Sequence, residues 1–109
     1  MENRLAVDLK VFRRRSGLSQ VEVAHLLGID RSQLSKFERG TRQPSMEHVT
    51  ILCLIYGMRT PEFCVAALPQ FEDVLVGRLQ KLLGENDQPS PALTRLVRKL
   101  EASRSRYDD

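Results

Sequence analysis

The sequence of 109 residues predicts an all-α protein. Apolar residues recur at spacings of three and four along most of the chain, which is the pattern of an amphipathic helix. Capping residues and glycines separate these periodic segments at intervals that suit short helices. Sustained alternation of apolar and polar residues bounded by hairpin turns is missing, so strands are not expected. We therefore expect about seven helices joined by short connections.

The first two predicted helices have clear ends. The first spans about residues 3–16, and Gly17 follows it where helices favour a left-handed residue. The second begins after Ser19, which forms a capping box with Glu22: each side chain accepts a hydrogen bond from the other residue's backbone amide. Gly28 ends this second helix.

The next two helices carry similar signals. We expect the third to begin after Asp30, with Gln33 completing a second capping box, and to end at Gly40. The fourth spans about residues 46–56 and ends at Gly57.

Prolines and a polar linker divide the rest of the chain. A short fifth helix should begin with Thr60 as its cap and Pro61 in its first turn, and Pro69 should end it. A sixth helix covers about residues 70–83, and a last one covers about 91–106 after the linker.

The charged residues are unevenly distributed over a chain of net charge +3. Residues 1–60 contain ten Lys or Arg and six Asp or Glu, a balance of +4, whereas residues 61–109 contain seven and eight, a balance of −1. Within Arg31–Arg42, four basic residues stand against one acidic residue, a balance of +3. Such a local excess favours a nucleic-acid phosphate backbone, although solvated basic helix faces are also common.

Other classes of protein find little support in the sequence. The longest apolar run, Ile51–Tyr56, has six residues and is too short to cross a bilayer. The N-terminus lacks an apolar signal segment, so we expect a cytoplasmic protein without a membrane partner. The sequence contains no nucleophile–base arrangement, paired acid motif or phosphate-binding Gly-rich loop, so we expect neither enzyme activity nor a cofactor.

The cysteines and histidines do not form a metal-ligand pattern. Cys53 and Cys64 each lie in an apolar stretch, which favours two buried, reduced thiols, with a disulfide or a redox sensor as the alternative. His25 and His48 lack partners at metal-ligand spacing, so we expect both on helix surfaces and no metal site.

The segment Leu18–Gly40 predicts two short helices that cross at a tight turn. Ala24 is small where the helices must approach closely, and Gly28 suits the left-handed backbone between them. An αα-hairpin that only packs a core would use the same residues. The outward face of the second helix of the pair distinguishes such a hairpin from a DNA-binding helix-turn-helix. That face is rich in groups that bind base edges and phosphates, namely Arg31, Ser32, Gln33, Ser35, Lys36 and Arg39. The segment therefore predicts a helix-turn-helix.

The longer segment LKVFRRRSGLSQVEVAHLLGIDRSQLSKFERGTRQPS carries a recurrent pattern. It contains a leading arginine, a GLSQ step, an alanine, a glycine at the turn, a polar helix ending in E-x-G and a following proline. In these features the chain resembles the Xre-like, lambda-repressor-like DNA-binding proteins over about residues 4–68. The resemblance implies a five-helix DNA-binding domain in residues 1–69, followed by a helical extension in residues 70–109.

The resemblance also implies a role for individual polar residues. Base contacts are expected from Arg31, Ser32, Gln33 and Lys36. Contacts with the DNA backbone are expected from Gln20, Ser35, Arg39, Thr41 and Arg42, and Gln20 is also expected to brace the recognition residues. Arg13 and Glu38 correspond to an internal ion pair that ties the first helix to the third. Because arginine suits a bidentate contact with guanine, Arg31 favours a half-site that contains G.

The extension of residues 70–109 leaves two arrangements open. Its two amphipathic helices would expose an apolar stripe if they stood alone, formed by Leu75, Leu79, Leu82, Leu93, Leu96 and Leu100. Both helices could fold back onto the five-helix core, or at least one could form a homodimer interface.

These observations predict a sequence-specific transcriptional regulator that binds double-stranded DNA, as a dimeric repressor of a palindromic operator. One alternative is an antitoxin-like autoregulator that also binds a partner protein. Another is a regulator that senses a peptide or small ligand through residues 70–109.

Overall fold

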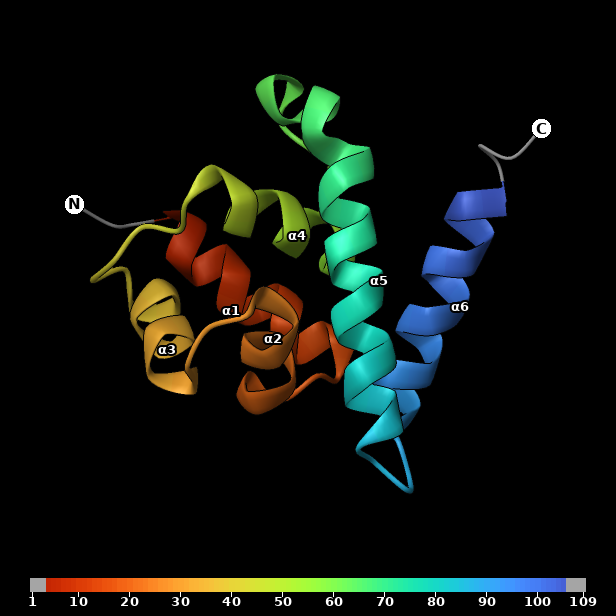
Figure 1. The fold of residues 1–109 in the computed structure, drawn as a ribbon. Coiled ribbons are helices and arrows are strands. Elements are labelled where there is room, and N and C mark those ends of the chain that lie inside the picture. Colours follow the sequence, from red (N-terminus) through yellow and green to blue (C-terminus); the bar gives the residue numbers. More distant parts are fainter. Residues whose placement is uncertain (1–3, 106–109) are drawn as a thin grey trace.

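The computed structural model describes residues 4–105, and over that range every regular element is a helix, which confirms the all-α prediction. Figure 1 shows the arrangement. The elements are α1 (Arg4–Ser16), α2 (Gln20–Leu27), α3 (Arg31–Arg39), α4 (Met46–Tyr56), a 3₁₀ helix η1 (Glu62–Ala67), α5 (Leu68–Gly84) and α6 (Pro91–Ser105).

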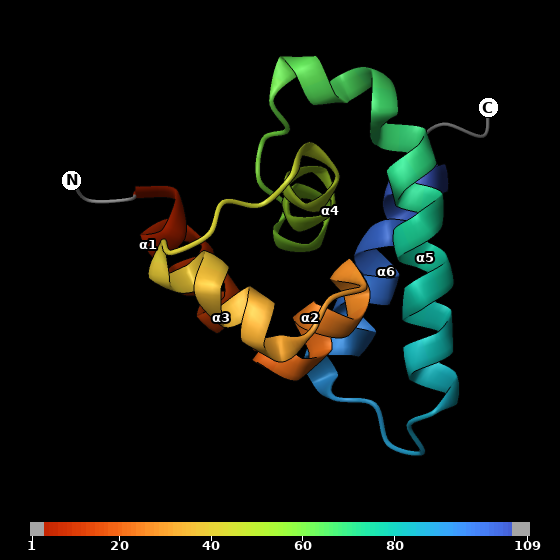
Figure 2. The same cartoon turned by 60° about the vertical axis from the view of Figure 1, so that its left-hand side comes forward.

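Helices α1–α4 form a compact group, and α5 runs along one side of it (Figures 1 and 2). A loop at one end of the molecule reverses the chain, so that α6 runs back antiparallel to α5. In both views α3 lies on the side of the molecule away from α6. The C-terminal helices therefore leave the outward face of α3 uncovered.

Both ends of α2 are formed by the residues that the sequence predicts. The Ser19 hydroxyl accepts a hydrogen bond from the Glu22 amide at 3.1 Å, and the Glu22 carboxylate accepts one from the Ser19 amide at 2.9 Å. The predicted capping box is thus confirmed. Gly28 ends α2 with φ 73°, a left-handed backbone that a side chain would strain.

The second predicted capping box is wrong. Asp30 is the N-cap of α3, but its side chain makes no capping hydrogen bond. Its backbone carbonyl instead accepts from the amides of Gln33 and Leu34, at 3.0 and 3.2 Å. The exposed carboxylate therefore stays in solvent.

The expected fifth helix also differs. Pro61, not Thr60, is the N-cap, and the helix is a single 3₁₀ segment that makes no side-chain capping bond. Pro69 does not end it but lies in the first turn of α5, which begins at Leu68. A proline in the first turn removes no helical hydrogen bond, because those amides have no partner within the helix. Pro69 thus lies at the start of one helix, whereas it was predicted to end the helix before it.

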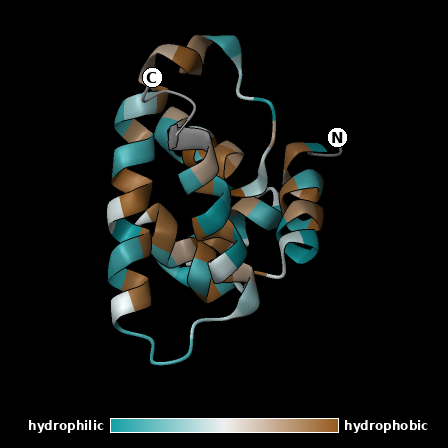
Figure 3. Ribbon diagram, turned by 90° about the vertical axis from the view of Figure 1, so that its right-hand side faces the viewer, coloured by the Kyte–Doolittle hydropathy of each residue, from teal (hydrophilic) through white to brown (hydrophobic). Residues whose placement is uncertain are grey.

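The core is one hydrophobic cluster to which both halves of the chain contribute. Val23 and Leu26 of α2 and Ile51 of α4 are fully buried, and Leu75 of α5 and Leu93 of α6 are equally inaccessible. Figure 3 shows the hydrophobic residues of α5 on the side that faces the other helices. Of the six leucines named above, five are buried and Leu82 is half-buried. Both C-terminal helices therefore fold back onto the helix-turn-helix.

The two cysteines are buried, and the two histidines are half-buried. Cys53 and Cys64 are free and buried, as predicted, and burial raises the pKa of the Cys53 thiol. The expected surface position is wrong for both histidines: His25 and His48 are half-buried, and the His48 ring lies 5.7 Å from that of Phe37. Burial lowers the pKa of His48, because the charged imidazolium would lose its hydration there.

Gly28 and Gly77 provide a matched test of the turn. A Cβ at Gly28 would sit at positive φ and 2.8 Å from the Arg78 guanidinium, whereas a Cβ at Gly77 within α5 meets nothing within 4 Å. We expect Gly28→Ala to lower the free energy of unfolding by about 1–2 kcal/mol. Gly77→Ala should raise it by about 0.5–1 kcal/mol, because alanine favours the helix. Urea denaturation measures both, and equal effects of the two substitutions would contradict the assigned role of the turn.

Candidate nucleic-acid interface

Helix α3 is anchored by one face and exposed on the other. Leu34, Phe37 and Glu38 are buried against the rest of the protein. The outward face is formed by Arg31, Ser32, Lys36 and Arg39, which are exposed, and by Gln33 and Ser35, which are half-buried. The structure thus brings together on one exposed helix all six of the polar residues that the sequence analysis singles out there.

The exposed charge of this surface is more positive than the formal charge of +3 that the sequence gives for residues 31–42. Arg31, Lys36, Arg39 and Arg42 are exposed, whereas Glu38, the one acidic residue between them, is 7% exposed. Because the charge of Glu38 is neutralised from outside the segment, four positive charges and no negative one face solvent between residues 31 and 42. A duplex would meet an uninterrupted cationic surface there.

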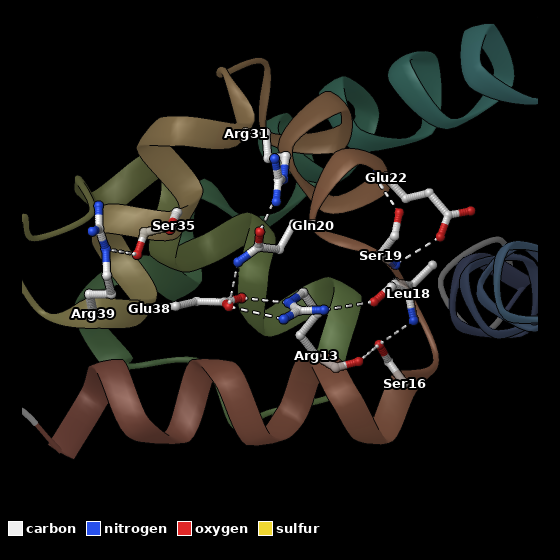
Figure 4. Close-up of polar contacts among 10 residues, drawn as sticks. All are labelled: Arg13, Ser16, Leu18, Ser19, Gln20, Glu22, Arg31, Ser35, Glu38 and Arg39. Atoms are coloured by element: carbon white, nitrogen blue, oxygen red, sulfur yellow. Dashed lines mark hydrogen bonds and ion pairs between the residues drawn. The ribbon is translucent and has the colours of Figure 1, made fainter.

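The neutralising partner of Glu38 is Arg13 of α1 (Figure 4). The Arg13 Nε donates to one carboxylate oxygen at 2.7 Å, and Nη2 donates to the other at 3.1 Å. A third donor of the same guanidinium, Nη1, reaches the Leu18 carbonyl at 3.3 Å. The hydrogen bond with Glu38 raises the pKa of Arg13. This bidentate contact fixes α3 against α1.

A second hydrogen bond extends the pair to the surface. The Gln20 amide nitrogen donates to Glu38 at 3.1 Å, and the Gln20 amide oxygen accepts from the Arg31 Nε at 3.2 Å. The four side chains form a continuous polar chain from α1 to the start of α3 (Figure 4). We call Arg13–Glu38–Gln20–Arg31 the bracing chain. It holds the Arg31 guanidinium by Nε and leaves its two terminal nitrogens to donate outward.

Residues at the end of α3 fold back onto the helix. Arg39 Nε lies 3.4 Å from the Ser35 carbonyl, and the Thr41 hydroxyl donates to the Lys36 carbonyl at 3.3 Å. The Arg42 amide donates to the same Lys36 carbonyl at 3.4 Å, while its side chain is exposed. These residues lie beside α3, at the end opposite to Arg31.

Two contacts that support the interface were not predicted. Arg78 of α5 donates to the Leu26 carbonyl at 3.2 Å and so holds the end of α2 beside the turn. The Ser90 hydroxyl before α6 donates to Glu22 at 3.0 Å, and therefore ties α6 to the capping box. The partners lie 52 and 68 positions apart, so no local spacing in the sequence could have signalled them.

The described part of the chain lacks the features of two other kinds of site. None of its helices is long and apolar enough to cross a membrane. Residues 4–105 also contain no group of three or more His, Cys, Asp or Glu that could hold a metal ion.

A buried arginine–glutamate pair, a glycine turn and an exposed cationic helix define a protein of the helix-turn-helix class. The family described as "helix-turn-helix domain" matches residues 4–63, and the chain belongs to this family. A curated relative is the antitoxin PezA of Streptococcus pneumoniae serotype 4, which is 39% identical over 46 residues. That alignment covers 42% of this chain and 29% of the antitoxin. No solved structure matches the chain at a significant level.

The bracing chain generates a stability prediction. Glu38→Ala leaves Arg13 half-buried without a carboxylate, so the free energy of unfolding should fall by about 3–5 kcal/mol. Glu101→Ala, at an exposed position of α6, is the control and should change it by less than about 0.5 kcal/mol. Chemical denaturation checks both, and similar values for the two variants would show that the pair is not needed to hold α3.

Proposed function

We propose that this protein is a sequence-specific transcriptional regulator of the Xre-like, lambda-repressor-like type, which inserts α3 into the major groove of double-stranded DNA. The observation that carries the proposal is the exposed cationic face of α3, held at its first residue by the bracing chain. An arginine held by a hydrogen bond at the start of a recognition helix suits the reading of base edges. In this proposal the protein acts by binding DNA and does not catalyse a reaction.

The roles of individual residues follow from their positions on α3. Arg31, Ser32 and Lys36 are exposed and would read bases, with Gln33 at the edge of the same face. The terminal nitrogens of Arg31 suit the two acceptors of guanine, O6 and N7.

The remaining polar residues would bind the DNA backbone. Ser35, Arg39, Thr41 and Arg42 lie along and beyond the end of α3, where phosphate contacts would fix the register of the helix. Gln20 would support the same contacts from α2 while it holds Arg31.

A base-specific and a backbone role can be separated by mutation. Arg31→Ala should reduce discrimination at one base position by about 1–3 kcal/mol. Arg42→Ala should weaken binding to all sequences evenly and lower the slope of log K against log salt by about 1. Selection of bound DNA from a random library, followed by gel-shift titration at several salt concentrations, measures both effects.

Arg98→Ala is the matched control, because Arg98 is an exposed arginine of α6, away from α3. It should leave the selected sequence and the affinity unchanged. Unchanged operator preference in the Arg31→Ala protein would contradict the base-reading role, and the absence of any selected sequence would contradict the proposed function.

We further propose that the protein binds a palindromic operator as a homodimer and represses by occupying it. One helix-turn-helix contacts few base pairs, and two related by a twofold axis read half-sites one helical turn apart. Because five leucines of α5 and α6 are buried within the chain, a dimer formed through residues 70–109 must use the outward sides of these helices. The five are Leu75, Leu79, Leu93, Leu96 and Leu100. Phe63 of η1, which is 74% exposed, would extend such a contact.

The oligomeric state has a direct measurement. Size-exclusion chromatography with light scattering should give twice the chain mass of 12.5 kDa at micromolar concentration. The Phe63→Ser protein should shift toward the monomer, because it loses apolar contact area. A native protein that runs strictly as a monomer, together with a selected DNA site without twofold symmetry, would overturn the dimer.

An antitoxin-like role is the second candidate. It is favoured by the similarity to the antitoxin PezA over 46 residues. In that role the protein would bind its own promoter through α3 and a partner protein through another surface. Co-purification with the product of a neighbouring gene would distinguish this function from that of a stand-alone regulator.

A further inference from the structure

A cavity of about 420 Å³ lies where α6 passes the C-terminal ends of α1 and α4. Figure 3 views the molecule from the side of α6. The volume falls within the range of small-molecule sites, which runs from about 300 to 1,000 Å³. The residues that matter most in its lining are Phe12, Arg15, Tyr56, Arg95, Leu96 and Lys99.

One wall of the cavity is aromatic. The rings of Phe12 and Tyr56 are stacked, with their centroids 6.3 Å apart and their planes at 17°. Leu96 continues this wall from α6. A flat apolar surface of this kind suits the hydrocarbon or ring portion of a ligand.

The remaining lining is cationic. Arg15, Arg95 and Lys99 all lie in it, and no Asp or Glu of the described chain lines the cavity. None of the three cations has an ion-pair partner among residues 4–105. This combination of an apolar wall and unpaired positive charge is complementary to an amphipathic anion.

Two of the cations, Arg95 and Lys99, lie against the ends of other helices. Arg95 Nη2 donates to the Ser16 carbonyl at 3.3 Å, at the end of α1. The ammonium group of Lys99 lies against Gly57, at the end of α4. Burial lowers the pKa of Lys99, since its charge loses hydration there without gaining a carboxylate. Helix-end carbonyls offset part of that loss, and a bound anion would offset more.

We propose that this cavity is a binding site for a small organic carboxylate, with its apolar body on the Phe12–Tyr56 wall and its carboxylate between Arg95 and Lys99. The site is separate from α3, so it does not depend on the proposed DNA binding. The Tyr56 hydroxyl is buried without a hydrogen-bond partner, and the charges of Glu38 and Arg13 act on it. An occupant would therefore touch a side chain adjacent to the bracing chain.

A matched pair of probes tests the proposal on the full chain without DNA. Naphthaleneacetate carries the carboxylate, and naphthaleneacetamide has nearly the same shape without the charge. Isothermal titration should give an affinity at least about tenfold higher for the carboxylate, as a charge-assisted hydrogen bond implies. Amide NMR shifts on titration should concentrate on α6 and on the ends of α1 and α4.

Lys99→Gln and Arg98→Gln make the same charge change at neighbouring exposed positions of α6, but only Lys99 lines the cavity. Lys99→Gln should remove most of the preference for the carboxylate, whereas Arg98→Gln should preserve it. If Arg95 and Lys99 serve only to cap helix ends, the two probes will bind alike. That result, an equal effect of the two variants, or shifts centred on another surface would overturn the proposal.

Discussion

The buried ion pair between Arg13 and Glu38 is the contact on which the arrangement of the interface depends. A carboxylate that is 7% exposed requires a partner, and the bidentate guanidinium meets that need from a different helix. The pair fixes α3 against α1 and offers Glu38 to Gln20, which in turn holds Arg31. One structural ion pair therefore supports, through Gln20, the cation at the start of α3, and it neutralises the one acidic residue between Arg31 and Arg42.

The C-terminal helices extend this framework. Their leucines enter the same hydrophobic cluster as α2 and α4, so the helix-turn-helix and the extension share one core. Polar contacts add to the apolar ones: Arg78 holds the end of α2, and Ser90 holds the capping box at its start. The helix that precedes the turn is thus supported at both ends by residues far along the chain.

The molecule carries two cationic surfaces of different character. On α3 the basic side chains are exposed and spread along a helix face, which suits an extended polyanion. Beneath α6 they converge on an aromatic wall, which suits a compact anion with an apolar body. Tyr56 lines this cavity, and the charges of Glu38 and Arg13 in the bracing chain act on its hydroxyl. Net charge alone does not distinguish the two surfaces, because the difference lies in the groups that neighbour the cations.

The sequence by itself determined the helices, the glycine turn and the polar face of α3, because capping, periodicity and backbone strain act over a few residues. The same local reasoning was wrong at Asp30 and Pro69, where one motif permits two local arrangements. Only the tertiary structure decided that the leucine stripes fold back, that Glu38 is shared between Arg13 and Gln20, and that a cavity forms under α6. These features join residues up to 79 positions apart, and such contacts arise from packing that no local spacing encodes.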